Sequence, residues 1–247
     1  MITIGSAKEM PYADNTFHAI ITSPPYWGLR IYGDDSENEI GRGSLSEYLD
    51  DMYAVGLEMQ RVLRDDGVLW VNIGDTASGS GGAGGDYNKG GRQHGRPKWK
   101  QGKSGLPPKQ WCNVPSRLSV MYQDLGFLLR AEVTWDKERL RPESLDHVRR
   151  PGVSSEKIFM FTKTDKYRFY PDGLIEKGSV WHFPPESAPR SHLAPFPLEL
   201  PRRCMLCSTK KGDLVLDPFA GRGTTLKAAA ICGRVGYGID IYPQQEQ

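Results

Sequence analysis

The stretch Asp217-Pro218-Phe219-Ala220-Gly221-Arg222-Gly223-Thr224-Thr225 decides the fold of this chain. It follows the apolar run Leu214-Val215-Leu216, which predicts a strand, and its glycines predict a tight turn before a helix that begins at Thr224. A strand, a glycine turn and a helix in this order are typical of open α/β sheets, which bind ligands just past the carboxyl ends of their strands. The sequence therefore predicts a ligand-binding loop near its C-terminus.

A second stretch of the same kind, Thr22-Ser23-Pro24-Pro25-Tyr26-Trp27, lies near the N-terminus. It follows the apolar run Ala19-Ile20-Ile21, and its two prolines cannot continue the hydrogen-bonding ladder of a strand. Its polar groups therefore also come just past the end of a strand. We expect the two stretches to meet at one edge of one sheet, although almost the whole chain separates them.

The segments between these stretches alternate between helix and strand patterns. Ser44 and Glu47 have the spacing of a capping box, and apolar residues recur at helical spacing from Leu45 to Leu63. The apolar run Val68–Ile73 then predicts a strand, and this order favours a parallel sheet. The predicted fold class is α/β: one Rossmann-like domain over residues 1–247, with a mostly parallel twisted sheet and a terminal antiparallel strand.

The composition suits one soluble domain kept in the cytoplasm. The chain has 247 residues, of which 38% are hydrophobic, and a mean hydropathy of −0.52. No apolar run approaches the ~18–20 residues of a membrane span, and the N-terminus lacks the pattern of a signal peptide. Four cysteines, with one CxxC at Cys204 and Cys207 and no second ligand pair, favour reduced thiols. We therefore expect no bound metal.

One segment carries a concentrated positive charge. From Lys89 to Lys109 there are seven Lys or Arg residues and no acidic residue, inside a flexible glycine-rich insertion expected over residues 76–112. Such charge is typical of a surface that contacts a nucleic-acid backbone. The alternative is a plain surface insertion without a partner. The candidate DNA-contacting residues here are Lys89, Arg92, Arg96, Lys98 and Lys100.

Two further loops are candidates for DNA recognition. The first spans residues 137–155 and is rich in arginine, and the second is the short, irregular segment over residues 166–192. The candidate DNA-contacting residues of the first loop are Arg139, Arg141, Arg149 and Arg150.

The two motif stretches resemble the catalytic and cofactor loops of permuted, β-class DNA amino-methyltransferases. In that permuted order the catalytic loop, here Thr22–Trp27, comes first and the cofactor loop, here Asp217–Thr225, comes last. The resemblance covers nearly the whole chain, because residues 194–197 match the helix start beside the cofactor and residues 127–137 and 156–164 match later strands. It implies a methyltransferase fold and an enzyme that transfers a methyl group from S-adenosylmethionine to an exocyclic base amine in double-stranded DNA.

The resemblance assigns catalysis to Ser23, Pro24, Pro25 and Tyr26. The lone pair of an exocyclic amine is delocalised into its ring, so a site can activate the amine by accepting its N–H groups. The Ser23 hydroxyl and the Pro24 carbonyl are suitable acceptors, held by a stiff proline pair. The base must leave the duplex to be reached, and we expect the ring of Tyr26 to stack on it, with Trp27 as a neighbouring DNA contact.

The cofactor loop has groups that suit S-adenosylmethionine. We expect Asp217 to receive the methionyl ammonium, directly or through water, and Asp240, at the end of the next strand, to bind the ribose. Thr224 and Thr225 are expected to cap a helix whose N-terminus favours the methionyl carboxylate. The glycines allow positive φ and close approach of the backbone. The implied cofactor contacts are Asp217, Pro218, Phe219, Ala220, Gly221, Gly223, Thr224, Asp240, Pro195 and Phe196.

The chain departs from the family pattern at Gly5-Ser6, where family members usually carry Gly-Asp, the acid binding the adenine amine. A serine at the first catalytic position resembles the cytosine-N4 branch, and adenine N6 is the alternative target. Cytosine C5 chemistry is excluded because no cysteine follows a proline. Related loops also act on RNA bases or glutamine amides, and a catalytically silent DNA-binding remnant is a hypothesis of another class. A cognate restriction endonuclease, and a monomer or homodimer, stay open.

Overall fold

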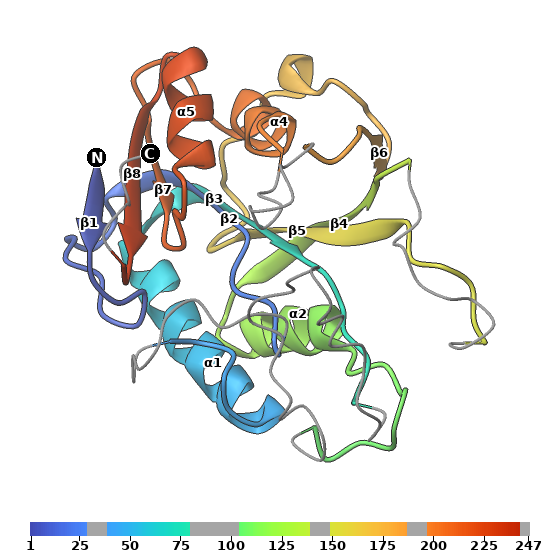
Figure 1. The fold of residues 1–247 in the computed structure, drawn as a ribbon. Helices are drawn as coiled ribbons and strands as arrows, with labels where there is room; N and C mark the ends of the chain where they lie inside the picture. The colour runs from blue at the N-terminus through green and yellow to red at the C-terminus, as the bar shows by residue number, and fades with distance from the viewer. Residues whose placement is uncertain (29–38, 80–103, 139–148, 187–196, 243–247) are drawn as a thin grey trace, which may run out of the picture.

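The computed structural model describes residues 1–28, 39–79, 104–138, 149–186 and 197–242, which form a mixed α/β domain (Figure 1). The strands are β1 (Ile2–Ile4), β2 (Phe17–Thr22), β3 (Leu63–Ile73), β4 (Leu128–Asp136), β5 (Ser155–Thr162), β6 (Val180–His182), β7 (Leu214–Asp217) and β8 (Val235–Asp240). The helices are α1 (Leu45–Val62), α2 (Val114–Asp124), α4 (Glu199–Ser208) and α5 (Thr224–Ile231), with a 3-10 turn, η2, at Pro171–Gly173.

The described strands form one eight-stranded sheet in the order β1-β8-β7-β2-β3-β5-β4-β6. Within it β5 runs antiparallel to both of its neighbours and the other pairs are parallel, so the predicted mostly parallel sheet is confirmed. The antiparallel strand lies inside the sheet, whereas the sequence predicted it at the end. The strand beyond β4 is β6, which comes from the segment predicted to be irregular. Its three residues are too few to show a strand period in the sequence.

The centre of the sheet joins the two ends of the chain. Strand β2 pairs in parallel with β7, with Ala19 opposite Val215 and Ile20 opposite Leu216. The carboxyl ends of parallel strands meet at one edge of the sheet, so the segments that follow β2 and β7 emerge side by side. The expected meeting of the two motif stretches is therefore confirmed.

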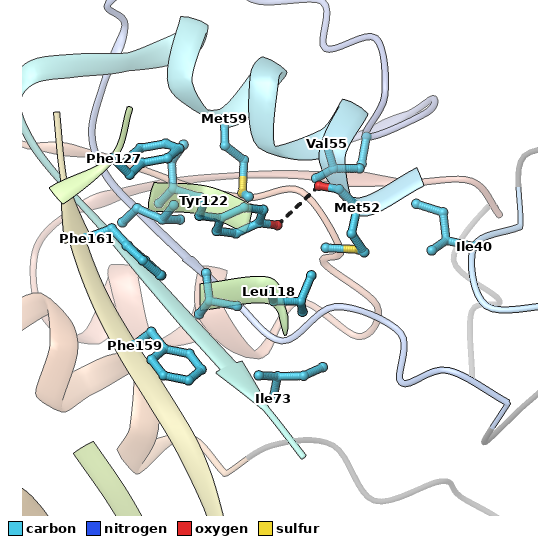
Figure 2. Close-up of a cluster of buried hydrophobic side chains, with 14 of the residues drawn as sticks. Ile40, Met52, Val55, Met59, Ile73, Leu118, Tyr122, Phe127, Phe159 and Phe161 are labelled. Carbon is cyan, nitrogen blue, oxygen red and sulfur yellow. Dashed lines mark hydrogen bonds between the residues drawn. The ribbon is translucent and has the colours of Figure 1, made fainter. Parts of the chain in front are cut away.

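Helices cover both faces of the sheet. Figure 1 shows α1 and α2 against one face and α4 and α5 against the other. Figure 2 shows the core under α1 and α2, where Tyr122 of α2 packs its ring 5.7 Å from that of Phe161 on β5. The buried Tyr122 hydroxyl donates to the carbonyl of Met52 on α1 at 3.4 Å, which satisfies its polar atom. These contacts pack α2 against both α1 and β5.

Helix α1 begins as the sequence predicts. The Ser44 hydroxyl accepts the backbone N–H of Glu47, and the Glu47 carboxylate accepts the backbone N–H of Ser44, which completes a capping box. The helix ends at Val62, and β3 begins at the next residue. Helix and strand are thus joined without a loop.

Candidate active site

A cavity of about 180 Å³ lies at the carboxyl ends of β1, β2, β7 and β8. Both motif stretches contribute to its wall: Ser23 and Pro25 from the first, and Pro218, Phe219 and Gly221 from the second. The rest of the described wall consists of Gly5, Ala7, Glu39, Ile40, Asp240, Ile241 and Tyr242.

Beside this cavity, Ser23 and Tyr26 contact a polar network at the ends of β3 and β5. The Ser23 Oγ lies 3.3 Å from Asn72 Oδ1, and the Tyr26 hydroxyl donates to Glu156 Oε2 at 2.7 Å. Asn72 Nδ2 donates to the same Glu156 oxygen at 3.2 Å, and the Lys137 ammonium pairs with the other. Two strands, β3 and β5, therefore hold the polar groups of one loop.

The Tyr26 hydroxyl keeps its proton at neutral pH. Burial, and then the negative charge of Glu156, raise the pKa of Tyr26 well above its usual value. The ring lies close to Gly74, where a Cβ atom would come within 2.8 Å of Tyr26 Cε2. A glycine at the end of β3 is therefore needed for this position of the ring.

Asp217 does not line the cavity, so the structure does not support a direct contact with a ligand ammonium there. Its side chain is fully buried, and its oxygens accept the hydroxyls of Thr22 at 2.7 Å and Thr225 at 2.6 Å. The backbone N–H of Phe219 also donates to it. Burial raises the pKa of Asp217 to about 6, although these hydrogen bonds favour the charged form. This carboxylate ties β2, β7 and α5 together.

The predicted threonine caps of α5 are also corrected. The residue at the N-cap is Gly223, which has a φ of 75° and makes no side-chain capping bond, and Thr225 turns inward to Asp217. Gly221 has a φ of 48°, so the expected positive φ at both glycines is confirmed. The turn depends on glycine backbone, while the threonine serves the buried acid.

Two carboxylates remain in the cavity wall. Asp240 Oδ2 accepts the backbone N–H of Gly221 at 2.9 Å and Oδ1 accepts that of Tyr242 at 2.9 Å, so it shapes both neighbouring segments. Glu39 accepts the Tyr242 hydroxyl at 3.3 Å and forms an ion pair with Arg42, with 1% of its side chain exposed. The wall is therefore acidic at one end and apolar at Phe219 and Ile40.

The comparison with known families matches this arrangement. Residues 17–247 match the N6_N4_Mtase family, described as DNA methylase. The chain belongs to this DNA methylase family.

Similar proteins of known name are Type II methyltransferases. The DNA methylase is 38% identical over 244 residues to the Type II methyltransferase M.Cfr9I of Citrobacter freundii, covering 91% of this chain and 77% of that protein. It is 35% identical over 257 residues to the Type II methyltransferase M.SmaI of Serratia marcescens, covering 97% and 86%.

Solved structures share the fold. The PvuII DNA methyltransferase, described as cytosine-N4-specific, superposes with a TM-score of 0.73 at 19% identity, over 98% of this chain and 82% of that one. A putative DNA modification methylase from Thermus thermophilus, solved with S-adenosyl-L-methionine, gives a TM-score of 0.67 at 26% identity, over 98% and 88%.

The structure sorts the predicted catalytic residues of the DNA methylase. Ser23 and Pro25 line the cavity, Pro24 is buried beside them, and Tyr26 is half-buried. Trp27, predicted to contact DNA, is fully buried in the core instead, and its Nε1 donates to the Gly43 carbonyl at 3.1 Å. An aromatic residue next to a catalytic loop carries no sequence signal that distinguishes packing from binding.

Of the predicted cofactor contacts, Pro218, Phe219, Gly221 and Asp240 line the cavity. The remaining described ones, Asp217, Ala220, Gly223 and Thr224, lie outside its lining. Pro195, Phe196, Lys89, Arg92, Arg96, Lys98, Lys100, Arg139 and Arg141 fall outside the described residues.

The two described arginines of the 137–155 loop lie away from this cavity lining. The Arg150 guanidinium stacks 4.6 Å from the ring centroid of Trp111, and Arg149 has a φ of 54°. Trp111 also forms an antiparallel β-bridge with Ala77, so the described ends of the 76–112 insertion are paired. Arg150 therefore packs against one end of this insertion. The DNA contacts of both segments stay predictions.

Asn72, Glu156 and Glu39 are site residues that sequence reasoning missed. Asn72 had a signal, because it is a polar residue near the end of an apolar strand, as Ser23 is. Glu156 had none, because the start of a strand reaches this edge of the sheet only when that strand is antiparallel. Antiparallel β5 therefore adds a carboxylate that motif position does not reveal.

Cys204 and Cys207 are buried on α4, and the described part of the chain has no cluster of three or more His, Cys, Asp or Glu side chains suited to a metal ion. Among the described helices, none combines the length and the apolar character needed to cross a lipid bilayer.

Proposed function

We propose that this DNA methylase transfers a methyl group from S-adenosylmethionine to the N4 amine of a cytosine flipped out of duplex DNA. One observation carries the proposal: the Ser23 hydroxyl, an acceptor for an amine, lines the same cavity as Asp240 and Phe219. An amine acceptor and a wall with both carboxylate and apolar groups therefore meet at one edge of the sheet.

The chemistry of the wall fits S-adenosylmethionine. Carboxylates suit a ligand with hydroxyl and cationic groups, and the apolar Phe219 and Ile40 suit a flat ring. In this assignment Asp240 holds the ribose hydroxyls, Gly221 offers close backbone, and Glu39 stands near as the second acid. The cofactor supplies a methyl group made electrophilic by a sulfonium. The structure with S-adenosyl-L-methionine from the Thermus relative supports the assignment.

The protein's own groups prepare the amine. The Ser23 hydroxyl and the Pro24 carbonyl accept the N–H groups, which draws the nitrogen toward tetrahedral geometry and frees its lone pair. Tyr26, whose hydroxyl is held by Glu156, offers a fixed ring for the flipped base, and such stacking contributes about 1–3 kcal/mol per base. The amine then needs no covalent intermediate, and its extra proton leaves to water.

The choice of cytosine rests on Ser23. A serine, rather than an aspartate, stands first in the catalytic loop, as in the cytosine-N4 branch that the sequence resembles. Adenine N6 is the competing target, because the same acceptors serve its amine and the family includes both kinds of enzyme. The Type II relatives support a role in restriction and modification with a cognate endonuclease.

Nucleoside analysis tests the proposal. Plasmid DNA incubated with the protein and deuterated-methyl S-adenosylmethionine should yield labelled N4-methylcytosine by mass spectrometry after digestion to nucleosides. A heat-denatured protein sample is the control. Labelled N6-methyladenine would replace cytosine by adenine as the target, and no label in any nucleoside would overturn the methyltransferase assignment for this chain.

A further inference from the structure

In the polar network beside Ser23, the neighbouring groups decide which atoms donate and which accept hydrogen bonds, and this bears on the reaction. We propose that Glu156 and Asn72 are positioning residues that commit the Ser23 proton to Asn72, so that Ser23 presents only acceptor lone pairs to the target amine. The inference deepens the proposed function and rests on it, because it concerns the same amine. It concerns residues on β3 and β5 rather than the catalytic loop itself.

The orientation of the Asn72 amide is fixed by its neighbours. Its Nδ2 lies 3.2 Å from Glu156 Oε2 and 3.2 Å from the Lys157 carbonyl, and both of these atoms only accept hydrogen bonds. An amide turned the other way would set its oxygen against two acceptors. The Asn72 Oδ1 therefore faces Ser23 and Tyr26.

The Tyr26 hydroxyl donates its proton to Glu156 rather than to the Asn72 amide oxygen. It has one proton, and Glu156 Oε2 lies 2.7 Å away, while Asn72 Oδ1 lies 3.4 Å away. The shorter bond, to a charged acceptor, is the stronger of the two. The hydroxyl that remains to donate to Asn72 Oδ1 is that of Ser23, at 3.3 Å.

Charge and burial keep the network in this arrangement. The Glu156 side chain is 12% exposed, and its carboxylate forms an ion pair with the Lys137 ammonium. Asn72 is 1% exposed, so water has little access to the amide and does not readily replace its partners. An unpaired polar group here would be costly, which favours the arrangement in which every donor has an acceptor.

The consequence for the amine is a matter of donors and acceptors. An exocyclic amine offers only N–H groups at the atoms to be held, so a hydroxyl that also points its proton at the nitrogen would compete for the lone pair. A Ser23 hydroxyl that already donates to Asn72 must turn its lone pairs elsewhere, and Ser23 lines the cavity. Glu156 acts on this hydroxyl only through Asn72.

A double-mutant cycle tests the proposal with the full chain, duplex DNA and S-adenosylmethionine. One Glu156 oxygen accepts from Asn72 and Tyr26 and the other pairs with Lys137. Glu156→Gln turns one of these oxygens into an N–H₂ donor and removes the charge, so the hold on the Asn72 amide should weaken. We expect kcat to fall by about 10- to 100-fold, the range for losing the outer partner of a functional side chain. Calorimetric affinity for S-adenosylmethionine should stay unchanged. In a Ser23→Ala background, Glu156→Gln should add less than about a twofold further loss.

Matched variants separate positioning from folding. Glu132→Gln makes the same substitution on β4, where Glu132 pairs with the exposed Lys157 ammonium, and should keep the wild-type kcat. If Glu156→Gln fails to fold, Asn72→Ala removes the Ser23 acceptor while leaving the Tyr26–Glu156 bond, and should show the same non-additivity. The proposal would be overturned if the losses were additive. It would also be overturned if kcat were unchanged in Glu156→Gln or in Asn72→Ala. A wild-type protein that methylates no base would instead defeat the proposed function itself.

Discussion

The carboxyl ends of β2 and β7 are neighbours in the sheet, yet their polar side chains do opposite things. After β2, the uncharged Ser23 lines the cavity. At the end of β7, the charged Asp217 turns into the core and accepts two threonine hydroxyls. The comparison teaches that a polar residue at the end of a strand marks a site without telling which way the side chain points.

The inward acid explains why the two loops stay together. Asp217 receives one hydroxyl from Thr22, in the loop that carries Ser23, and another from Thr225, in the helix that follows its own loop. Segments far apart in the sequence are therefore joined by one buried side chain. The acid places the loops, and Ser23 is the residue proposed to accept the amine.

The largest expected effect concerns the pH dependence of stability. The pKa of Asp217 is about 6 when folded and 3.8 when unfolded, so its contribution is fully present below about pH 4 and is lost as pH rises through 6. Two pKa units correspond to about 3 kcal/mol. Asp217→Asn does not titrate at this position. As the pH rises from 4 to 7, the free energy of unfolding of the wild type should therefore fall relative to that of the variant, by up to about this amount.

Urea unfolding of both proteins across this pH range measures the difference. Parallel curves for Asp217→Asn and the wild type would show that the acid is not the buried, protonatable group described above. The asparagine side chain of this variant offers both a donor and an acceptor to the two threonine hydroxyls, so the variant should fold.

The next effect concerns the chemistry. Ser23→Ala removes an amine acceptor and should lower the rate of methyl transfer by roughly 10²-fold, within the range for a lost positioned catalytic group. Its affinity for S-adenosylmethionine should barely change. Single-turnover transfer of a labelled methyl group to DNA measures the rate, and a fall in cofactor affinity equal to the fall in rate would refute the division between the loops.

A smaller effect is expected at the end of β8. Asp240→Ala removes an acid from the cavity wall and should weaken S-adenosylmethionine binding by about tenfold, or about 1.4 kcal/mol. Part of that loss should come from the backbone N–H groups of Gly221 and Tyr242, which lose their acceptor. Calorimetry measures the affinity, and transfer at saturating cofactor should stay within a few-fold of wild type; an unchanged affinity would remove Asp240 from the cofactor site.

Motif order and strand patterns predicted much of the fold. The apolar runs before Thr22 and Asp217 identified β2 and β7, and their meeting follows from how parallel strands share an edge. The placement of β5 could not be predicted, because a strand's direction depends on pairing with distant segments that periodicity does not record. For that reason the sequence did not predict that the Glu156 carboxylate lies at the site.

The candidate site was predicted where backbone geometry decides and missed where side-chain direction decides. Gly221 and Gly223 take the positive φ expected of glycine turns. Asp217 and Trp27 were assigned to ligands, and Thr225 to a helix cap, but all three side chains are buried in the core. Residues next to a motif alternate between cavity and core, and only the packed structure shows which of them is buried.

The most direct test of the account is the affinity of Asp217→Asn for S-adenosylmethionine, measured by calorimetry at pH 7.5. Because Thr22 and Thr225 occupy both carboxylate oxygens, the account predicts a dissociation constant within about twofold of wild type, a difference well below 1 kcal/mol. A loss of more than tenfold in a variant with wild-type folding would mean that Asp217 binds the cofactor itself, and would contradict the contrast between the two strand ends.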